Sequence, residues 1–285
     1  MNFSFYETYQ KEVKKNCLCR LIFTCFNFLF RLNSTIKRSI LFDQEIKKLG
    51  ISQASANFLD FLKIRLQVTG RTKLEKNTGY LFFGNHPTLI DPIAMMTVIA
   101  DDQMKFFSGA NVLKIGPNLA RHIFPIKNMQ EKNGKKRKEI LIDWIYTLFF
   151  KSLVEYWERE KAIKHNRFQV EKAADFLASG GRFLIFPILD FSGKRRFQKG
   201  IGFILSKARQ KNKERKIKIV PFFVGIKYAN LFTLLTLFKY RKPINLEIVL
   251  ADPIDFSQYQ KLIKKPKELA LVIEADYLKF IKGFS

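Results

Sequence analysis

The sequence predicts an α/β fold in which a mixed, largely parallel central sheet is flanked by helices and preceded by an N-terminal amphipathic helical extension. Short apolar runs rich in β-branched and aromatic residues have the composition of buried strands, for example GYLFFG at 79–84 and RFLIFP at 182–187. Segments with apolar residues at helical spacing lie between these runs, and this alternation is typical of parallel strands. With 285 residues and 47% apolar content, the chain is long enough to bury such a core.

Residues 1–60 are predicted to form an N-terminal helical membrane-associating segment, and residues 61–285 a single domain without repeats or linkers. In the first segment, KEVKK precedes the apolar and aromatic stretch CLCRLIFTCFNFLFRL at 17–32. Polar residues interrupt this stretch at Arg20, Asn27 and Arg31. It therefore falls short of the roughly 20 continuous apolar residues that span a bilayer. We expect residues 5–32 to form a helix in the membrane interface, where its lysines contact anionic head groups. The alternative is a helix that packs on the protein core.

In the domain, GYLFFG is predicted to be a buried strand, after which the chain enters a loop at Asn85 and a helix that starts with Pro92. Asp255 or Ser257 is expected to cap a C-terminal helical region that reaches Phe280. The other predicted elements are, in order, a strand at 104–110, a short helix at 111–120 broken by Gly116 and Pro117, a strand at 121–128, one or two amphipathic helices at 138–160, a helix at 168–179 ended by Gly180 and Gly181, a strand at 182–187, a loop at 188–200, a helix at 201–212, and strands at 216–228 and 244–254.

The formal net charge of +26, from 51 Lys and Arg against 25 Asp and Glu, predicts an anionic partner. Anionic membrane lipids, an acidic carrier protein and nucleic acid are the candidate partners. No nucleic-acid-binding module is recognisable and the basic residues are spread along the chain, so we expect no specific nucleic acid. A biased genome, which would also account for 30 Phe residues, is the alternative reason for the charge.

The three cysteines, Cys17, Cys19 and Cys25, lie close together in the N-terminal segment, with no ligand-type neighbours that would complete a metal site. This pattern indicates a reduced, cytosol-facing segment, and palmitoylation is the alternative use of membrane-proximal cysteines. Together with the interface helix, it predicts a peripheral or monotopic membrane protein on the cytoplasmic face of the membrane.

A histidine and an aspartate, His86 and Asp91, lie five positions apart directly after the strand GYLFFG. In a regular helix this offset would place the two side chains about 140° apart. Pro87 and Pro92 disfavour the helical region for the residues before them, so the segment between the pair is not a helix. A tight turn would let Asp91, as the N-cap of the helix that starts with Pro92, reach back toward His86.

Such a pair suits general base catalysis. The aspartate would fix one imidazole tautomer and stabilise the imidazolium, while the other ring nitrogen takes a proton from a hydroxyl. If that hydroxyl belongs to the substrate, the chemistry requires no covalent intermediate, no metal and no tightly bound cofactor. The alternative is an ordinary loop histidine beside an ordinary N-cap aspartate.

Four segments follow one another along the chain: GNHPTLID at 84–91, HIFPIKN at 122–128, LIFPILDFSGKRRFQKG at 184–200 and IVPFFVGIKY at 219–228. In this order they resemble the four motifs of the glycerolipid acyltransferase family, to which lysophosphatidic acid acyltransferases belong. The hallmark of the first motif is Asn-His followed by four residues and Asp. The third motif has Phe-Pro-Glu-Gly-Thr-Arg-Ser before Phe-x-Lys-Gly, and the fourth is an apolar strand with Pro.

The resemblance covers about residues 65–255 and implies that residues 61–285 are an acyltransferase domain of phospholipid biosynthesis. It implies an O-acyltransferase in which His86 is the general base and Asp91 orients it, with Asn85 among the residues that bind substrate. The acyl donor would be acyl-CoA or acyl carrier protein, as a co-substrate. The acceptor would be a lysophospholipid, most similar to 1-acylglycerol-3-phosphate.

The chain departs from the family pattern in two motifs. Ile188, Leu189 and Phe191 stand at the Glu, Gly and Arg of the third motif, and Asn128, beside Lys127, stands at the Arg of the second. In the family these residues help to seat the phosphate-bearing acceptor. The departures leave the acceptor open and make a catalytically inactive lipid-binding protein of the same fold the alternative function. Nearby Asp190 is either a substitute for the missing glutamate or an ordinary turn residue.

Positive charge is kept in the third motif. Lys194, Arg195, Arg196 and Lys199 lie between a predicted strand and a helix that begins near Gly200. Basic side chains and a helix N-terminus could hold a phosphate group together, so these five residues are predicted to bind substrate. A solvated basic loop is the alternative.

Overall fold

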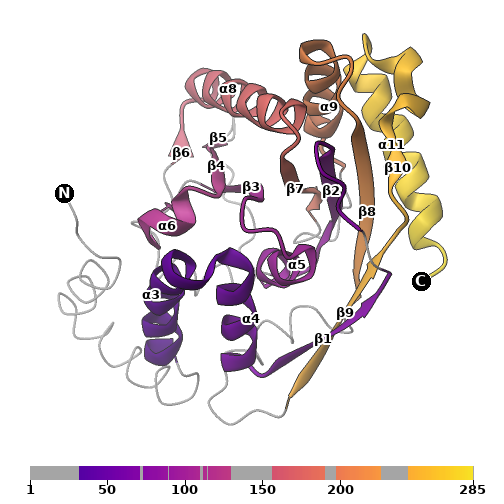
Figure 1. Cartoon of the computed structure of the whole chain (residues 1–285). Helices are drawn as coiled ribbons and strands as arrows, with labels where there is room; N and C mark the ends of the chain where they lie inside the picture. Colours follow the sequence, from indigo (N-terminus) through magenta and orange to yellow (C-terminus); the bar gives the residue numbers. More distant parts are fainter. Residues whose placement is uncertain are drawn as a thin grey trace, which may run out of the picture.

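An eight-stranded mixed sheet forms the centre of the structure (Figure 1). The computed structural model describes residues 32–70, 73–88, 90–109, 112–113, 115–129, 156–189, 197–225 and 243–284. The strands of the sheet are β1 (Ile64–Thr69), β2 (Gly79–His86), β3 (Lys105–Gly109), β4 (Ile123–Ile126), β7 (Arg182–Leu189), β8 (Ile217–Gly225), β9 (Ile244–Leu250) and β10 (Ile254–Asp255). Their order is β1-β9-β8-β2-β7-β3-β4, with β10 paired to β8.

The sheet has a parallel part and an antiparallel part. The neighbouring strands β8, β2, β7, β3 and β4 are parallel, whereas β9 and β10 run antiparallel to β8, and β1 is parallel to β9. The predicted mixed, largely parallel sheet is therefore confirmed. Because the carboxyl ends of the five parallel strands meet at one edge, residues that follow these strands lie together there.

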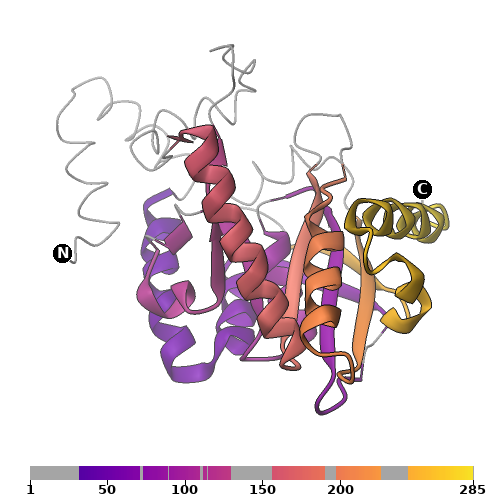
Figure 2. The same cartoon turned by 90° about the horizontal axis from the view of Figure 1, so that it is seen from above.

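Helices cover both faces of the sheet (Figures 1 and 2). One layer contains α3 (Leu32–Leu49), α4 (Ile51–Phe61) and α5 (Asp91–Ile99). The other contains α8 (Arg159–Ala178), α9 (Gly200–Lys211), the 3-10 helix η3 (Phe256–Leu262) and α11 (Pro266–Ile281). A short helix α6 (Pro117–Ala120) and a two-stranded sheet of β5 (Asn128–Met129) and β6 (Tyr156–Trp157) complete the described elements.

The central strand β2 is buried from both sides. Tyr80 and Phe82 join the core on the α3, α4 and α5 side, whereas Leu81 and Phe83 join the core on the side of α8, α9 and α11. Each of these side chains is at most 1% exposed, and each gains about 1.5–3 kcal/mol by leaving water. These four buried residues of β2 therefore fix the position of the strand directly before Asn85 and His86.

Most predicted elements are present in the described residues, with different ends. β2 continues for two residues beyond the predicted loop entry, so Asn85 and His86 are strand residues. Pro117 was predicted to break a helix, but it is the first residue of α6, because a proline at the start of a helix loses no intrahelical hydrogen bond. The predicted cap at Asp255 is confirmed, since its carboxylate accepts a hydrogen bond from the Ser257 N–H at 2.8 Å.

The prediction of a helix at 138–160 is wrong for residues 156 and 157, and residues 138–155 lie outside the described part of the chain. Tyr156–Trp157 form a strand that pairs in parallel with Asn128–Met129, and α8 begins only at Arg159. Aromatic residues are favoured in strands, and here main-chain pairing outweighs the helical spacing of apolar side chains. Residues 5–31 of the predicted interface helix and the three cysteines also lie outside the described part of the chain.

The helices α3 and α4 share a core with the sheet, although nearly all of their residues belong to the predicted N-terminal segment 1–60. Phe42, Ile46 and Phe58 are buried in the same hydrophobic cluster as Tyr80 of β2. The membrane role of residues 1–60 stays a prediction. Across the described ranges, no helix has the length and apolar character needed to cross a membrane.

A buried carboxylate ties α3 to the loop between β3 and β4. Asp43 is 6% exposed and accepts hydrogen bonds from the Leu119 N–H at 2.8 Å and from Asn118 Nδ2 at 2.9 Å. Gly116 packs so closely that a Cβ atom there would lie 2.1 Å from Cγ of Asp43. The carboxylate thus satisfies main-chain and side-chain donors at the start of α6.

Replacing Asp43 by alanine is expected to lower the free energy of unfolding by about 1–3 kcal/mol, because buried donors lose their acceptor. Urea unfolding followed by circular dichroism measures this change. Asp60→Ala is the matched control, since it removes an exposed aspartate from the neighbouring helix α4 and should change stability by no more than about 0.5 kcal/mol. Equal effects of the two substitutions would contradict the anchoring role of Asp43.

Candidate active site at the end of strand β2

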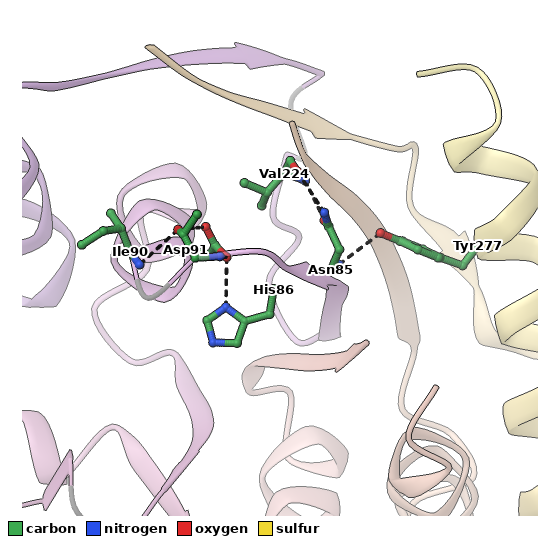
Figure 3. Close-up of polar contacts among 7 residues, drawn as sticks. Asn85, His86, Ile90, Asp91, Val224 and Tyr277 are labelled. Atoms are coloured by element: carbon green, nitrogen blue, oxygen red, sulfur yellow. Dashed lines mark hydrogen bonds and ion pairs between the residues drawn. The ribbon is translucent and has the colours of Figure 1, made fainter. Parts of the chain in front are cut away.

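His86 and Asp91 meet at the carboxyl end of β2 (Figure 3). Nδ1 of His86 lies 2.9 Å from Oδ2 of Asp91. The strand ends at His86 and α5 begins at Asp91, so the short turn between them brings the two side chains together. This is the contact expected of a non-helical segment between Pro87 and Pro92.

The predicted capping position of Asp91 is wrong by one residue. The N-cap of α5 is Ile90, with φ −89° and ψ −17°, and Asp91 is the first helical residue. Because Ile90 already has helical dihedral angles, the helix starts one position earlier than the proline alone indicates. Asp91 still lies in the first turn, where a negative charge interacts favourably with the helix dipole.

Thr88 supplies two further donors to the Asp91 carboxylate. Its main-chain N–H donates to Oδ2 at 2.7 Å, and its hydroxyl donates to Oδ1 at 2.5 Å. Asp91 is fully buried, and buried charges require such compensation. Three hydrogen bonds and the helix N-terminus therefore balance the buried charge.

This geometry assigns the histidine tautomer. An ionised carboxylate only accepts hydrogen bonds, so Nδ1 of His86 carries the proton that is donated to Asp91. In the neutral ring the lone pair is then on Nε2. The His86 side chain is 15% exposed. This arrangement would let Nε2 take a proton from a hydroxyl, as general base catalysis requires.

A phenylalanine from the neighbouring strand β7 stacks on the His86 ring. The ring centroids of His86 and Phe186 are 4.5 Å apart, with an angle of 29° between the planes. Phe186 itself packs edge-on against Phe222 of β8 at 5.6 Å. The imidazole plane is therefore held by stacking on one face in addition to the hydrogen bond at Nδ1.

The two other histidines have different partners. His122 Nδ1 bonds to the main-chain oxygen of Met104 at 3.0 Å, and His165 Nε2 bonds to that of Pro125 at 2.9 Å. Burial lowers the pKa of His122 below its usual value, an effect that the bond to Met104 opposes. His86 is the histidine that shares a hydrogen bond with a carboxylate.

Asn85 connects the end of β2 to β8 and α11 (Figure 3). Its Oδ1 accepts from the Val224 N–H at 2.7 Å, and its Nδ2 donates to the Val224 oxygen at 2.9 Å. Its main-chain N–H donates to the Tyr277 hydroxyl at 3.1 Å. The Asn85 side chain therefore has a structural role, and its predicted part in substrate binding stays a prediction.

The start of α9 lies at the same edge of the sheet. The Gln198 N–H donates to the Pro187 oxygen of β7 at 2.7 Å, and Phe197 packs edge-on against Phe83 of β2 at 6.5 Å between ring centroids. Lys199, which is exposed, and Gly200 follow at the first turn of α9. The other predicted substrate-binding residues, Lys194, Arg195 and Arg196, lie outside the described residues.

Three side chains that contact the site were not predicted. Thr88 had a signal, because Thr-Leu-Ile-Asp fits the Ser/Thr-x-x-acid pattern of a capping box. Phe186 and Tyr277 had none, because their contacts depend on strand pairing and helix packing between distant segments. In the described part of the chain, no group of three or more His, Cys, Asp or Glu side chains could hold a metal ion.

Comparison with known proteins gives a likeness to solved structures. No protein-family model matches the sequence, and no curated protein sequence matches it. Among solved structures, the chain is similar to the 1-acyl-sn-glycerophosphate (LPA) acyltransferase PlsC from Thermotoga maritima, with 16% sequence identity and a TM-score of 0.39. The match covers 88% of this chain and 90% of that chain. The roles of individual residues therefore rest on the contacts described above.

Replacing Thr88 by valine is expected to lower the free energy of unfolding by about 1–3 kcal/mol, because the buried Asp91 carboxylate loses a hydroxyl donor. Urea unfolding measures the change. Thr97→Val is the matched control: that hydroxyl donates to the Ile93 oxygen within α5 at 3.2 Å, and a change of no more than about 0.5 kcal/mol is expected. If the Thr88→Val protein is as stable as the Thr97→Val protein, the Asp91 carboxylate does not depend on the Thr88 hydroxyl for its stability.

Proposed function

We propose that the protein is an O-acyltransferase that moves a fatty acyl group from acyl-CoA or acyl carrier protein to the hydroxyl of a lysophospholipid-like acceptor. The observation that carries the proposal is the 2.9 Å hydrogen bond between His86 Nδ1 and the buried Asp91 carboxylate at the carboxyl edge of the sheet. The order of the four sequence segments that resemble the glycerolipid acyltransferase motifs supports the same reaction.

In the proposed mechanism, His86 acts as general base. Nε2 takes the proton from the acceptor hydroxyl as its oxygen attacks the thioester carbonyl. The tetrahedral intermediate then collapses to the ester and expels the thiolate, which takes the proton back from the imidazolium. General base catalysis of this kind contributes about 10²–10⁴-fold in rate, and correct positioning of the reactants contributes much of the rest.

Two neighbours support the charged state of His86 in this mechanism. The Asp91 carboxylate, fixed by Thr88, stabilises the imidazolium while it exists. Phe186 offers the face of an aromatic ring at 4.5 Å, and such faces attract cations. Main-chain N–H groups near Asn85 or in the basic loop are the proposed donors to the carbonyl oxygen, where charge develops.

The proposed acceptor is 1-acylglycerol-3-phosphate, with Lys194, Arg195, Arg196 and Lys199, together with the N-terminus of α9 at Gly200, as its phosphate site. The net charge of +26 favours an anionic acceptor, an acidic donor and an anionic membrane surface. We place the protein at the cytoplasmic face of the membrane, as a peripheral or monotopic protein of phospholipid biosynthesis. The departures at Ile188 and Leu189 favour a second candidate, a lipid-binding protein without turnover.

His86→Ala is expected to reduce acyl transfer to 1-acylglycerol-3-phosphate by about 10²–10⁴-fold, because the general base is removed. The assay supplies a labelled acyl donor and a panel of lysophospholipid acceptors in membranes, and mass spectrometry identifies the products. His122→Ala is the control. His122 lies just before β4, at the amino end of the parallel strands, whereas His86 lies at their carboxyl end. The substitution should leave turnover close to wild type.

Unchanged turnover in a folded His86→Ala protein would remove the mechanism. A wild-type protein that transfers no acyl group to any acceptor, yet binds lysophospholipid, would establish the second candidate function instead.

The wild-type protein is expected to sediment with vesicles that contain anionic phospholipid, and less so as salt rises, because the attraction is screened. Vesicles of neutral phosphatidylcholine alone are the control. Retention on RNA or heparin at the same salt concentrations tests the competing partner. Salt-resistant binding to RNA without binding to anionic vesicles would overturn the lipid assignment.

A further inference from the structure

The C-terminal helix α11 reaches the end of β2 through one hydroxyl group. Tyr277 is fully buried, and its hydroxyl accepts from the Asn85 N–H at 3.1 Å and donates to the Phe222 oxygen of β8 at 3.2 Å. Figure 3 shows the tyrosine pointing from α11 toward Asn85, beside His86. The bond joins residues that are 192 positions apart in the sequence.

The hydroxyl lies where β2 separates from β8. The last paired residues of the two strands are Gly84 and Phe222. At Gly84 the main chains are so close that a Cβ atom would lie 2.3 Å from the Phe222 oxygen. On the other side of β2, the register with β7 shifts between Phe83 and Asn85. The ladder with β8 therefore ends at Gly84, whereas the pairing with β7 continues, with a shifted register, through His86.

Side chains replace the missing ladder bonds at this point. The Tyr277 hydroxyl lies between the Asn85 N–H and the Phe222 oxygen, which two directly paired strands would join without an intermediary. One residue further, the Asn85 amide takes the place of a strand by bonding to both main-chain groups of Val224. The path of the chain into His86 is thus set by these two side-chain groups.

The Tyr277 ring is itself held in place. It packs against Phe83 of β2 at 5.5 Å and against Phe280 of α11 at 6.1 Å between ring centroids. Because the ring is buried among these neighbours, its hydroxyl has a fixed position. A contact this rigid can transmit the placement of α11 to β2.

We propose that Tyr277 is a positioning residue for His86: its hydroxyl keeps β2 and β8 apart at Asn85, and so holds the imidazole in line with Asp91. The inference rests on the proposed function for its kinetic consequence. Tyr277 acts through Asn85, whose main-chain N–H donates to its hydroxyl. Without the hydroxyl, the Asn85 N–H and the Phe222 oxygen can close directly on one another, which moves the next residue, His86.

Tyr277→Phe tests this role, because it removes the hydroxyl and keeps the ring. We expect kcat for acyl transfer to fall by about 10–10²-fold, the scale of a displacement of about 1 Å at a catalytic group, with KM little changed. Tyr259→Phe is the matched control. Tyr259 also bonds to α11 through its hydroxyl, which donates to Asp276 Oδ2 at 2.8 Å, so the same chemical change is made at a bond between η3 and α11.

A second readout does not depend on activity. The chain contains three histidines, so ¹⁵N-histidine NMR resolves each ring, and His86→Ala identifies the His86 signals. We expect Tyr277→Phe to shift the Nδ1 and Nε2 resonances of His86 while those of His122 and His165 stay in place. Tyr259→Phe should leave all three rings unchanged.

The outcomes separate this inference from the proposed function. An inactive wild-type protein would remove the acyltransferase proposal, whereas the NMR comparison would still decide whether Tyr277 positions His86. Unshifted His86 signals in Tyr277→Phe, or an equal shift in Tyr259→Phe, would overturn the inference. If Tyr277→Phe does not fold, Phe280→Leu is the second variant, because it loosens the Tyr277 ring and keeps its hydroxyl. We expect a smaller shift of the His86 resonances in this variant. Unshifted His86 resonances would count against the inference.

Discussion

The separation of β2 from β8 after Gly84 is the constraint on which the rest of the site depends. A buried strand that leaves its sheet uncovers main-chain groups, and each buried group left without a partner costs about 1–3 kcal/mol. Here the Tyr277 hydroxyl and the Asn85 amide supply the partners. The chain can therefore separate from β8 without losing hydrogen bonds while it stays paired with β7, and the side chain of His86 can meet the first residue of α5.

Asp91 combines two tasks that usually fall to different residues. Its carboxylate accepts from the N–H and the hydroxyl of Thr88, which closes the turn and compensates a fully buried charge. The same carboxylate accepts from His86 Nδ1 and fixes the tautomer. Because hydrogen bonds from Thr88 already hold the aspartate in place, the histidine gains a pre-organised partner. The stability of the turn and the orientation of the His86 ring thus depend on one carboxylate.

The parts of this arrangement that follow from local signals could be predicted from the sequence. Two prolines exclude a helix between His86 and Asp91, and apolar runs mark most strands. The strand at 64–69 was missed although IRLQVT alternates apolar and polar residues, and Thr88 was missed although its spacing to Asp91 fits a capping box. Tyr277 could not be found in this way. Its hydrogen bond depends on the packing of α11 against β2, which no short segment encodes.

Neighbouring residues of β2 are supported by helices that pack on opposite faces of the sheet. Asn85 is bonded by Tyr277 from the α11 side, while His86 is bonded by Asp91 at the start of α5. A displacement of the strand end toward either face is therefore opposed by a hydrogen bond from the other. General base catalysis needs heavy atoms within about 2.6–3.2 Å of each other. Support from one face alone would leave the strand end free to move toward the other, so the three-layer architecture itself contributes to the precision of the site.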